Sequence, residues 1–272
     1  MKIVPFSAYK RVNILNNKPQ DIKIVIALHK RYWVPQDAVY LPLQVGRAIN
    51  EDLGLTGDDT GDNISNRNAK YCELTALYWA WKNLRADYVG LVHYRRHFGK
   101  AGLFDNVTKK QAAVFTKNDF QKYLVDCDCL LPVKRNYYIE TVRSQFEHAH
   151  DKLILAETEA ILLALYPDYQ DAFTTVMSRR SLHICNMFVM KRALLDAYCE
   201  FIFSILFELE RRVTNQYHWD ESRIYGFLGE RLFDVWLEKN KIEYKEAGVI
   251  MFEPVNWPRK IGNFVKRKLV KL

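Results

Sequence analysis

Several features of common protein classes are missing from this 272-residue chain, and each absence narrows what the protein can be. Its five cysteines are an odd number without the spacing of a disulfide framework, which is typical of free thiols in a reducing compartment. The first twenty residues are mixed and polar and lack the apolar core of a secretory signal. No apolar stretch is long enough to cross a bilayer. We therefore expect a cytoplasmic protein, free or associated peripherally with the inner face of the cell membrane.

The motifs of several enzyme classes are missing as well. The chain has no glycine-rich phosphate loop ending in Gly-Lys, no kinase signature set and no Gly-x-Ser-x-Gly nucleophile motif. A phosphotransferase is therefore disfavoured, and so is a hydrolase of the Gly-x-Ser-x-Gly kind. The basic residues outside the last segment are interspersed with acids and form no motif of a known nucleic-acid-binding module, so nucleic acid is not expected as a partner.

What the chain does contain favours a well-packed α/β domain. Hydrophobic residues make up 49% and aromatic residues 14% of it, enough for one sizeable core. Residues 22–28 form a near-continuous apolar run, as in a central parallel strand. Further buried strands are predicted at 88–92, 129–132 and 182–190, and helical patterns cover 69–84, 116–125, 194–209 and 223–237.

The segment 88–98 carries the strongest sign of a binding site. Its short apolar strand ends in His93-Tyr94-Arg95-Arg96-His97. In open α/β sheets, ligands bind just beyond the carboxyl ends of strands. Cations beside a buried strand are unfavourable unless an anion receives them. The run therefore indicates a phosphate or diphosphate site, with a solvated turn or local ion pairs as the alternative.

A loop at 54–66 holds three glycines and a group of acids, Asp58, Asp59 and Asp62, followed by Asn63. Such side chains can bind a divalent metal, hydrogen-bond sugar hydroxyls or simply solvate a turn. The ligand positions and closing glutamate of an EF-hand are missing.

Three further polar residues stand out against apolar surroundings. Asn186 interrupts a predicted strand, and its amide can both donate and accept, as recognition of a sugar hydroxyl requires. Glu230 lies near the start of an amphipathic helix and could act as a general base, or pair with Arg223 or Arg231. His148 is a weaker ligand-binding candidate. A core amide and a plain polar helix face are the respective alternatives for Asn186 and His148.

The last segment, 254–272, carries six cations and no acid, with apolar residues at helical spacing. This pattern predicts a basic amphipathic helix that binds an anionic membrane surface. A helix docked on the core, or a basic tail touching nucleic acid, are the alternatives.

Several segments taken together resemble a known family. They are residues 58–65, 71–83, 90–98, 132–141, 186–188 and 226–237. The combination is similar to a bacterial polysaccharide family long catalogued only as a domain of unknown function, DUF4422, and associated with capsule, exopolysaccharide and O-antigen glycosyltransferases. The resemblance covers nearly everything from residue 22 to 258. It implies a GT-A-like (Rossmann-like) nucleotide-diphosphosugar transferase with a mostly parallel central sheet flanked by helices. We expect this domain at 22–253, after an extension at 1–21 and before the basic segment at 254–272.

The resemblance, joined to the residue patterns, predicts a role for each candidate residue. A leaving nucleoside diphosphate needs its developing charge stabilised, and we expect cations to do this in place of a metal. No cofactor is therefore expected, with Mn²⁺ or Mg²⁺ on Asp58, Asp59 and Asp62 as the alternative. The catalytic residues are predicted to be Glu230, His93, Arg95 and Arg96. Donor binding is assigned to His29, Asp58, Asp59, Asp62, Asn63 and Tyr94. Acceptor or sugar binding is assigned to Asn136, Tyr137, His148, Asn186 and Arg223.

The expected reaction moves galactose or galactofuranose from a UDP-sugar to a lipid-linked oligosaccharide, such as an undecaprenyl-diphosphate-linked glycan. The alternative from another class is a non-catalytic protein of the membrane surface that binds carbohydrate or phosphate. It would share the aromatic residues, Asn186 and the arginines but would need no base.

Overall fold

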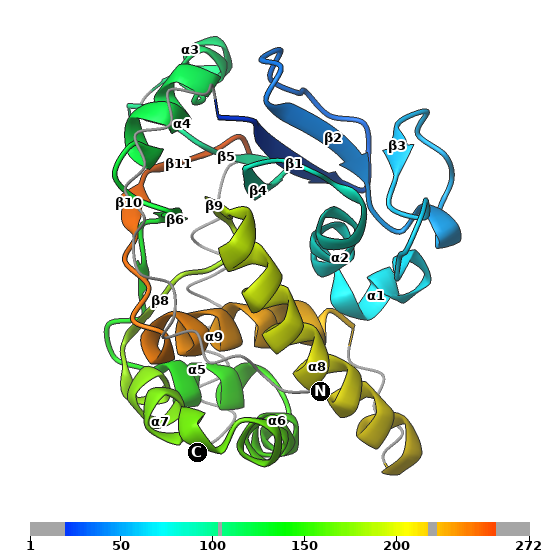
Figure 1. Ribbon diagram of the computed structural model, residues 1–272, viewed down its shortest axis with the longest axis vertical. Coiled ribbons are helices and arrows are strands. Elements are labelled where there is room, and N and C mark those ends of the chain that lie inside the picture. The colour runs from blue at the N-terminus through cyan, green and yellow to red at the C-terminus, as the bar shows by residue number, and fades with distance from the viewer. Residues whose placement is uncertain (1–19, 103–104, 217–221, 254–272) are drawn as a thin grey trace.

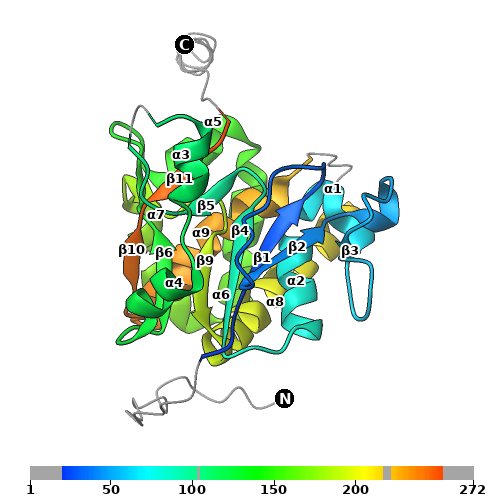
Figure 2. The same cartoon turned by 90° about the horizontal axis from the view of Figure 1, so that it is seen from above.

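A mixed sheet forms the centre of the protein and is buried on both faces (Figures 1 and 2). The computed structural model describes residues 20–102, 105–216 and 222–253. Its main sheet has nine strands, seven of them in the spatial order β10-β6-β9-β4-β1-β2-β3. In that order the strands span Lys245–Ala247, Cys129–Pro132, Phe188–Lys191, Tyr88–His93, Ile22–Leu28, Tyr40–Gln44 and Thr56–Gly57. β5 (Arg96–Phe98) and β11 (Val249–Met251) extend the sheet beside β4, and β7 (Arg135–Asn136) pairs with β8 (Ser181–Leu182).

The strand order reverses beside β1, and this reversal fixes where a ligand can bind. The chain runs from β1 outward to β2 and β3, then returns to place β4 on the other side of β1. β1 and β4 are parallel, so their carboxyl ends meet at one edge of the sheet. β9 runs antiparallel to both β4 and β6, which brings its amino end to that same edge. Open α/β sheets bind ligands at such a reversal, outside the carboxyl ends of the strands.

Helices pack mainly against one face of the sheet. The helices are α1 (Asn68–Tyr71), α2 (Leu74–Asn83), α3 (Val107–Ala112), α4 (Lys117–Leu124), α5 (Val142–Ala149), α6 (Lys152–Leu165), α7 (Gln170–Ser178), α8 (Arg192–Gln216) and α9 (Ile224–Lys239). Short 3-10 turns lie at Arg47–Ile49, Ser65–Arg67 and Pro167–Tyr169. α2, α8 and α9 share the larger apolar core, and α5, α6 and α7 gather beyond α9 (Figure 1).

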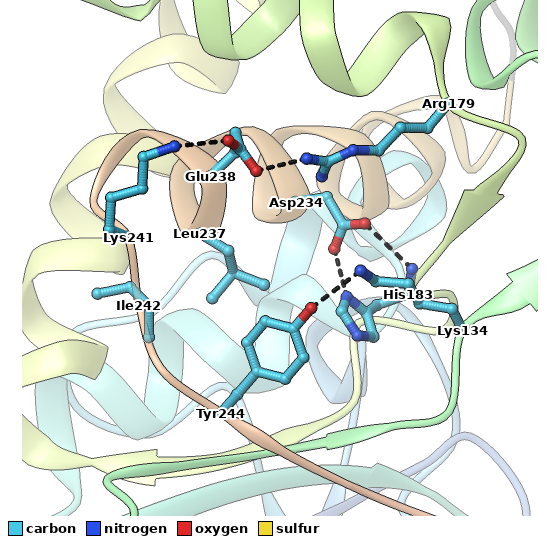
Figure 3. Close-up of a pocket in the computed structure, with 9 residues that line it drawn as sticks. All are labelled: Lys134, Arg179, His183, Asp234, Leu237, Glu238, Lys241, Ile242 and Tyr244. Carbon is cyan, nitrogen blue, oxygen red and sulfur yellow. Dashed lines mark hydrogen bonds and ion pairs between the residues drawn. The ribbon is translucent and has the colours of Figure 1, made fainter.

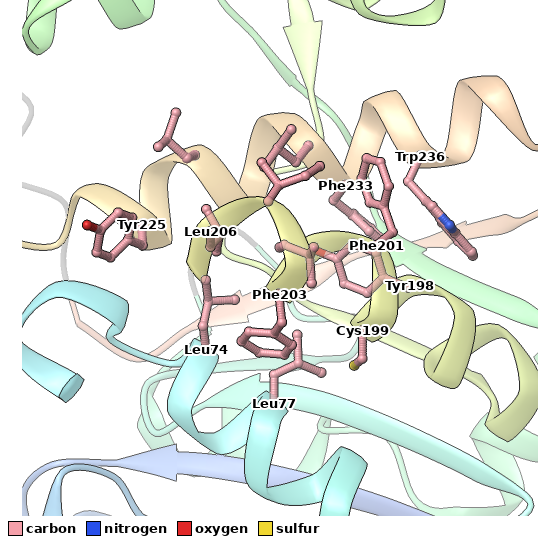
Figure 4. Packing of buried hydrophobic residues seen from close by; sticks show 14 of the residues in the cluster. Leu74, Leu77, Tyr198, Cys199, Phe201, Phe203, Leu206, Tyr225, Phe233 and Trp236 are labelled. Atoms are coloured by element: carbon pink, nitrogen blue, oxygen red, sulfur yellow. The ribbon is translucent and has the colours of Figure 1, made fainter. Parts of the chain in front are cut away.

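Alternation along β1 shows how the two faces are filled. Val25 and Ala27 contribute to the core under α2, α8 and α9, whereas Ile24 and Ile26 contribute to a second core that includes Phe120 of α4. A strand that is buried on both sides reads as a continuous apolar run, which explains the segment 22–28. Aromatic side chains of α8 and α9 interlock in the larger core (Figure 4).

The structure confirms the predicted strands at 22–28, 88–92 and 129–132 and breaks two other predicted elements. The single helix predicted at 69–84 is two helices, because Cys72 has a left-handed φ of 52° and separates α1 from α2. The strand predicted at 182–190 is divided into β8 and β9, because Cys185 and Asn186 also have positive φ, 76° and 47°.

The predicted extension at 1–21 lies almost wholly outside the described residues, and the basic segment at 254–272 lies outside them entirely. Within the described ranges, no helix combines the length and apolar character that crossing a membrane requires.

Candidate functional site

A group of polar side chains meets where the carboxyl end of β4 faces the amino end of β9. We call Glu73, His93, Arg96, Asn186 and Glu230 the carboxyl-edge cluster. These residues come from the start of α2, the end of β4, the start of β5, the segment before β9 and the first half of α9. Four of them were predicted from the sequence as site residues, and Glu73 was not.

Glu230 is the chemically most distinctive member of the cluster. Its side chain is only 15% exposed, and its Oε1 accepts a hydrogen bond from the backbone N–H of Cys185 at 2.6 Å. Arg231 lies beside it, with 3.5 Å between Nη1 and Oε2. Burial raises the pKa of Glu230 to about 7, while Arg231 and the Cys185 N–H act against that rise. The carboxyl of Glu73 also raises it, and Arg96 lowers it. A carboxylate with a pKa near neutrality suits a general base.

Glu73 is held in the cluster by Asn186. The Nδ2 of Asn186 donates to Glu73 Oε1 at 2.7 Å and to the backbone oxygen of Gly226 at 3.0 Å. Both donors of this buried amide are therefore used inside the protein, and its Oδ1 has no partner among the described residues. That oxygen faces Gly229, where a Cβ would lie 3.0 Å from it. Asn186 thus joins α2, α9 and the segment before β9, and its predicted contact with a sugar stays a prediction.

Strained backbone surrounds the cluster. Four residues here have φ between 47° and 76°, a region that residues other than glycine rarely adopt: Cys72, Cys185, Asn186 and Arg223. Such residues cost on the order of 1–3 kcal/mol each and concentrate at functional sites. Here the strain orients Glu73, the Cys185 N–H and the start of α9 toward one another.

His93 and Arg96 complete the cluster. The Nε2 of His93 lies 2.5 Å from the backbone oxygen of Cys185. Burial lowers the pKa of His93, Glu73 raises it and Arg96 lowers it. Arg96 is half-buried and pairs with no described carboxylate, so its charge is available to an anion.

More cations gather around His29 at the neighbouring end of β1. We call Lys30, Arg95 and Arg223 the β1 cation group. Burial lowers the pKa of His29, and the charges of Lys30, Arg95 and Arg223 lower it further. Lys30 and Arg95 both pair with Glu253, whereas Arg223 pairs with no described carboxylate. Arg223 was predicted on the acceptor side, and the structure places it beside His29 and at the start of α9.

Two members of the run 93–97 serve packing. His97 is fully buried beside the rings of Trp33, Tyr40 and Phe252, and burial lowers its pKa to about 4. It is thus an uncharged core residue and not one of the cations expected at the strand end. Tyr94 is also buried, with its ring centroid 4.8 Å from that of His29. Tyr94 therefore forms a wall behind His29, and its contact with a donor stays a prediction.

The predicted donor loop has its polar groups occupied within the loop. The carboxylate of Asp58 is fully buried and accepts bonds from the Gly46 N–H at 2.9 Å, the Arg47 N–H and the Ser65 hydroxyl. Asp59 pairs with Arg47 at 2.7 Å. These contacts are what a structural loop requires, and a donor contact by this loop stays a prediction.

The remaining loop positions are also bound locally. Asp62 accepts from Tyr78, and Asn63 Oδ1 accepts from the Ser65 N–H at 3.2 Å. Throughout the described residues, no group of three His, Cys, Asp or Glu side chains is arranged to hold a metal ion. The three aspartates of the loop therefore do not converge on one point.

Of the predicted acceptor residues outside the cluster, Tyr137 interacts electrostatically with Glu230. It is partly buried, burial raises its pKa, and the charges of Arg231 and Glu230 act on it. Asn136 is exposed and accepts from the Tyr138 N–H at 2.7 Å. His148 is exposed on α5 and bonded to Glu140 at 2.6 Å. The structure therefore brings Tyr137 close to Glu230, whereas Asn136 and His148 bond to local partners, Tyr138 and Glu140.

A pocket of about 250 Å³ opens along the second half of α9 (Figure 3). His183 lies in its wall, with Nδ1 2.5 Å from Asp234 Oδ1 and Nε2 3.1 Å from Glu246 Oε1. The His183 N–H also donates to Asp234 at 3.3 Å. These bonds fasten the segment before β9 to α9, so this pair supports the same segment that presents Cys185 and Asn186 to the cluster.

Sequence reasoning missed Glu73, whereas the alternative it gave for Glu230, a pair with Arg231, is present at 3.5 Å. Glu73 lies within the segment 71–83 that carries the family resemblance, which is the signal that could have found it. Arg231 is 3% exposed and bonds Gln145 at 2.5 Å and the Phe227 oxygen at 2.8 Å.

Comparisons with known proteins bear on the fold and the family of the chain. No curated protein sequence matches the chain. Among solved structures, an apo structure of WbbM, described as a bifunctional glycosyltransferase, is similar with a TM-score of 0.76 and 32% identity. The similarity covers 86% of this chain and 46% of that one, so this chain spans less than half the length of WbbM. The likeness confirms the predicted GT-A-like α/β fold.

A family model matches residues 23–241, which contain the whole carboxyl-edge cluster and lie inside the domain predicted at 22–253. The family is described as a domain of unknown function, DUF4422, which is the family that the sequence motifs resemble. Because the match spans most of its length, the chain belongs to the DUF4422 family.

Proposed function

We propose that the protein is a glycosyltransferase that uses a nucleoside diphosphate sugar, with Glu230 as the base. The observation that carries this proposal is a buried carboxyl with a pKa of about 7 at the point where the strand order reverses. Buried bases next to unpaired cations suit a reaction in which a hydroxyl loses a proton while an anion departs. The WbbM structure, titled a glycosyltransferase, supports the same class.

The arrangement accounts for each step of the transfer. Glu230 takes the proton of an acceptor hydroxyl, whose oxygen attacks the anomeric carbon of the donor sugar. The bond from that carbon to the diphosphate oxygen breaks, and the departing group takes the bonding electrons. Arg96 and Arg223, which have no described acid partner, stabilise the negative charge that develops there. Arg95 pairs with Glu253, as Lys30 does, so part of its charge is already neutralised. In this proposal it therefore assists Arg96 and Arg223.

The finer parts of the proposal come from the family resemblance. They are a UDP donor of galactose or galactofuranose, a lipid-linked oligosaccharide acceptor, and a role in capsule, exopolysaccharide or O-antigen synthesis at the inner face of the membrane. Fixed cations would take the place of a metal, and a chelator should then leave turnover intact.

The Glu230→Gln variant tests the proposal. A thermal-shift screen of UDP, GDP, CDP and dTDP with their sugars first identifies the donor, because a ligand that binds only the folded protein raises its melting temperature. The variant should bind this donor as the wild type does, while turnover falls by about 10²–10⁴-fold, as expected when a general base is lost.

The matched control is Glu200→Gln, the same change at an exposed position of α8, which should leave turnover unchanged. Full turnover in Glu230→Gln would remove Glu230 as the base. Binding without turnover of any acceptor by the wild-type protein would favour the non-catalytic alternative.

A further inference from the structure

The carboxyl of Glu73 has hydrogen-bonding capacity that its contacts within the described residues do not use. One oxygen, Oε1, accepts the Asn186 bond at 2.7 Å, and its other oxygen makes no hydrogen bond with a described residue. The side chain is half-buried, so a packing role alone does not explain a carboxylate here.

The backbone is distorted to bring Glu73 to this place. Cys72 has φ 52° and ψ −128°, and it ends α1 one residue before Glu73. An uninterrupted helix from 69 to 84 would be the lower-energy conformation for this apolar pattern. Asn186, which holds the carboxyl, is itself left-handed. Two strained residues thus determine the position of one carboxylate.

Glu73 lies near the proposed proton acceptor and the end of β4, because it acts electrostatically on both Glu230 and His93. The segment that carries it is bound to the start of α9 through the Arg223 N–H, which donates to the Ala69 oxygen at 3.0 Å. Arg223 in turn belongs to the β1 cation group. A sugar that extends from a diphosphate at Arg223 toward Glu230 would therefore pass the segment that carries Glu73.

We propose that Glu73 binds hydroxyl groups of the donor sugar, with Asn186 holding its carboxylate in the orientation that this requires. Carboxylates accept hydrogen bonds from hydroxyls, and a bond to a charged acceptor is stronger than one between neutral groups. The inference rests on the proposed function, because it needs a nucleoside diphosphate sugar at the β1 cation group. It goes beyond that function by naming the residue that distinguishes the sugar from the nucleotide.

Two binding measurements on Glu73→Gln test the inference. The probes are the nucleoside diphosphate that most stabilises the wild-type protein and its galactose conjugate. The glutamine keeps the side-chain volume and an oxygen for Asn186, so folding should be preserved. The affinity for the diphosphate alone should stay within about twofold, whereas that for the sugar conjugate should fall at least about tenfold. Glu200→Gln, the control, should change neither.

A second variant and a pH profile exclude a merely structural role. Glu73→Asp shortens the side chain by one methylene. It should also weaken the binding of the sugar conjugate and leave the binding of the diphosphate unchanged. In Glu73→Gln, the acid limb of kcat/KM should move to lower pH, since the Glu73 carboxyl raises the pKa of Glu230.

The outcomes separate the two proposals. Equal loss of both ligands, or loss of neither, in the Glu73 variants would overturn the inference and leave the role of Glu230 intact. Full turnover in Glu230→Gln would overturn the role of the base and leave the Glu73 binding result standing. Absence of nucleotide binding by the wild-type protein would overturn both.

Discussion

At the scale of single residues, Glu230 is defined by a conflict between burial and charge. Its side chain has little contact with solvent, which disfavours ionisation, yet it accepts a backbone N–H and lies beside Arg231, which favour it. The balance leaves the group titrating near neutral pH. A base with that property can take a proton and lose it again within one catalytic cycle.

Because of the same balance, the ionisation of Glu230 makes the free energy of unfolding depend on pH. The pKa of Glu230 rises from an ordinary value of 4.5 to about 7, so the folded protein holds the proton more tightly than the unfolded chain does. Its stabilising contribution is therefore complete below about pH 4.5 and is lost as the pH rises through about 7. The slope should not exceed about 1.4 kcal/mol per pH unit.

Urea unfolding of the wild-type protein and Glu230→Gln between pH 5 and pH 8 measures this contribution. The free energy of unfolding of the wild type should fall relative to that of the variant as the pH increases. A difference between the two that stays constant over this range would contradict the shifted pKa. Glu200→Gln again serves as the control.

At the scale of elements, the pair of Asp234 and His183 supports the site from behind. Both side chains are almost fully buried, and they fix the segment before β9 to α9 (Figure 3). Removing one partner of a buried hydrogen-bonded pair leaves the donors of the other without an acceptor, and this costs about 1–3 kcal/mol. Asp234→Asn should therefore reduce the free energy of unfolding by about that amount.

Glu238→Gln is the matched control for this prediction, because Glu238 lies one turn further along α9 and pairs with Arg179 and Lys241 nearer the surface. This variant should lose about 1 kcal/mol or less of its free energy of unfolding. Equal losses in the two variants, measured by chemical denaturation, would mean that the Asp234–His183 pair stabilises the protein no more than a surface ion pair does.

The sequence predicts the regular elements better than it predicts the site. Apolar periodicity located β1, β4 and β6, because burial on the sheet depends on local spacing. It failed at Cys72 and at Cys185 and Asn186, where helix and strand patterns continue through residues that are left-handed. Tertiary bonds impose that backbone, and they are invisible in a one-dimensional pattern. Glu73 was missed for this reason, since its position depends on the break at Cys72.

At the scale of the whole molecule, the positive charge has two distinct locations. The β1 cation group and Arg96 lie at the carboxyl edge of the sheet, in the described part of the chain. The segment 254–272, with six cations and no acid, lies outside the described residues. The first location fits a diphosphate, and the composition of the second fits an anionic membrane surface.

Deletion of residues 256–272 tests this division of labour. The shortened protein should no longer sediment with vesicles that contain anionic lipid, because about 1 kcal/mol of attraction is lost with each cation near the surface. Activity on a soluble acceptor should be unchanged, since Glu253 and its partners are kept. Vesicles of zwitterionic lipid provide the control. Undiminished binding to anionic vesicles after the deletion would show that another surface attaches the protein.

Glu230 and Asp234 are one turn apart on α9, and each holds the segment 183–187 through a backbone N–H. Two attachment points on a single rigid rod fix the direction of that segment as well as its position. Glu230 and Asn186 are therefore expected to move as one body. A shift of Glu73 relative to that body would occur at the break between α1 and α2, which meets that body through Glu73 and through the backbone of Ala69.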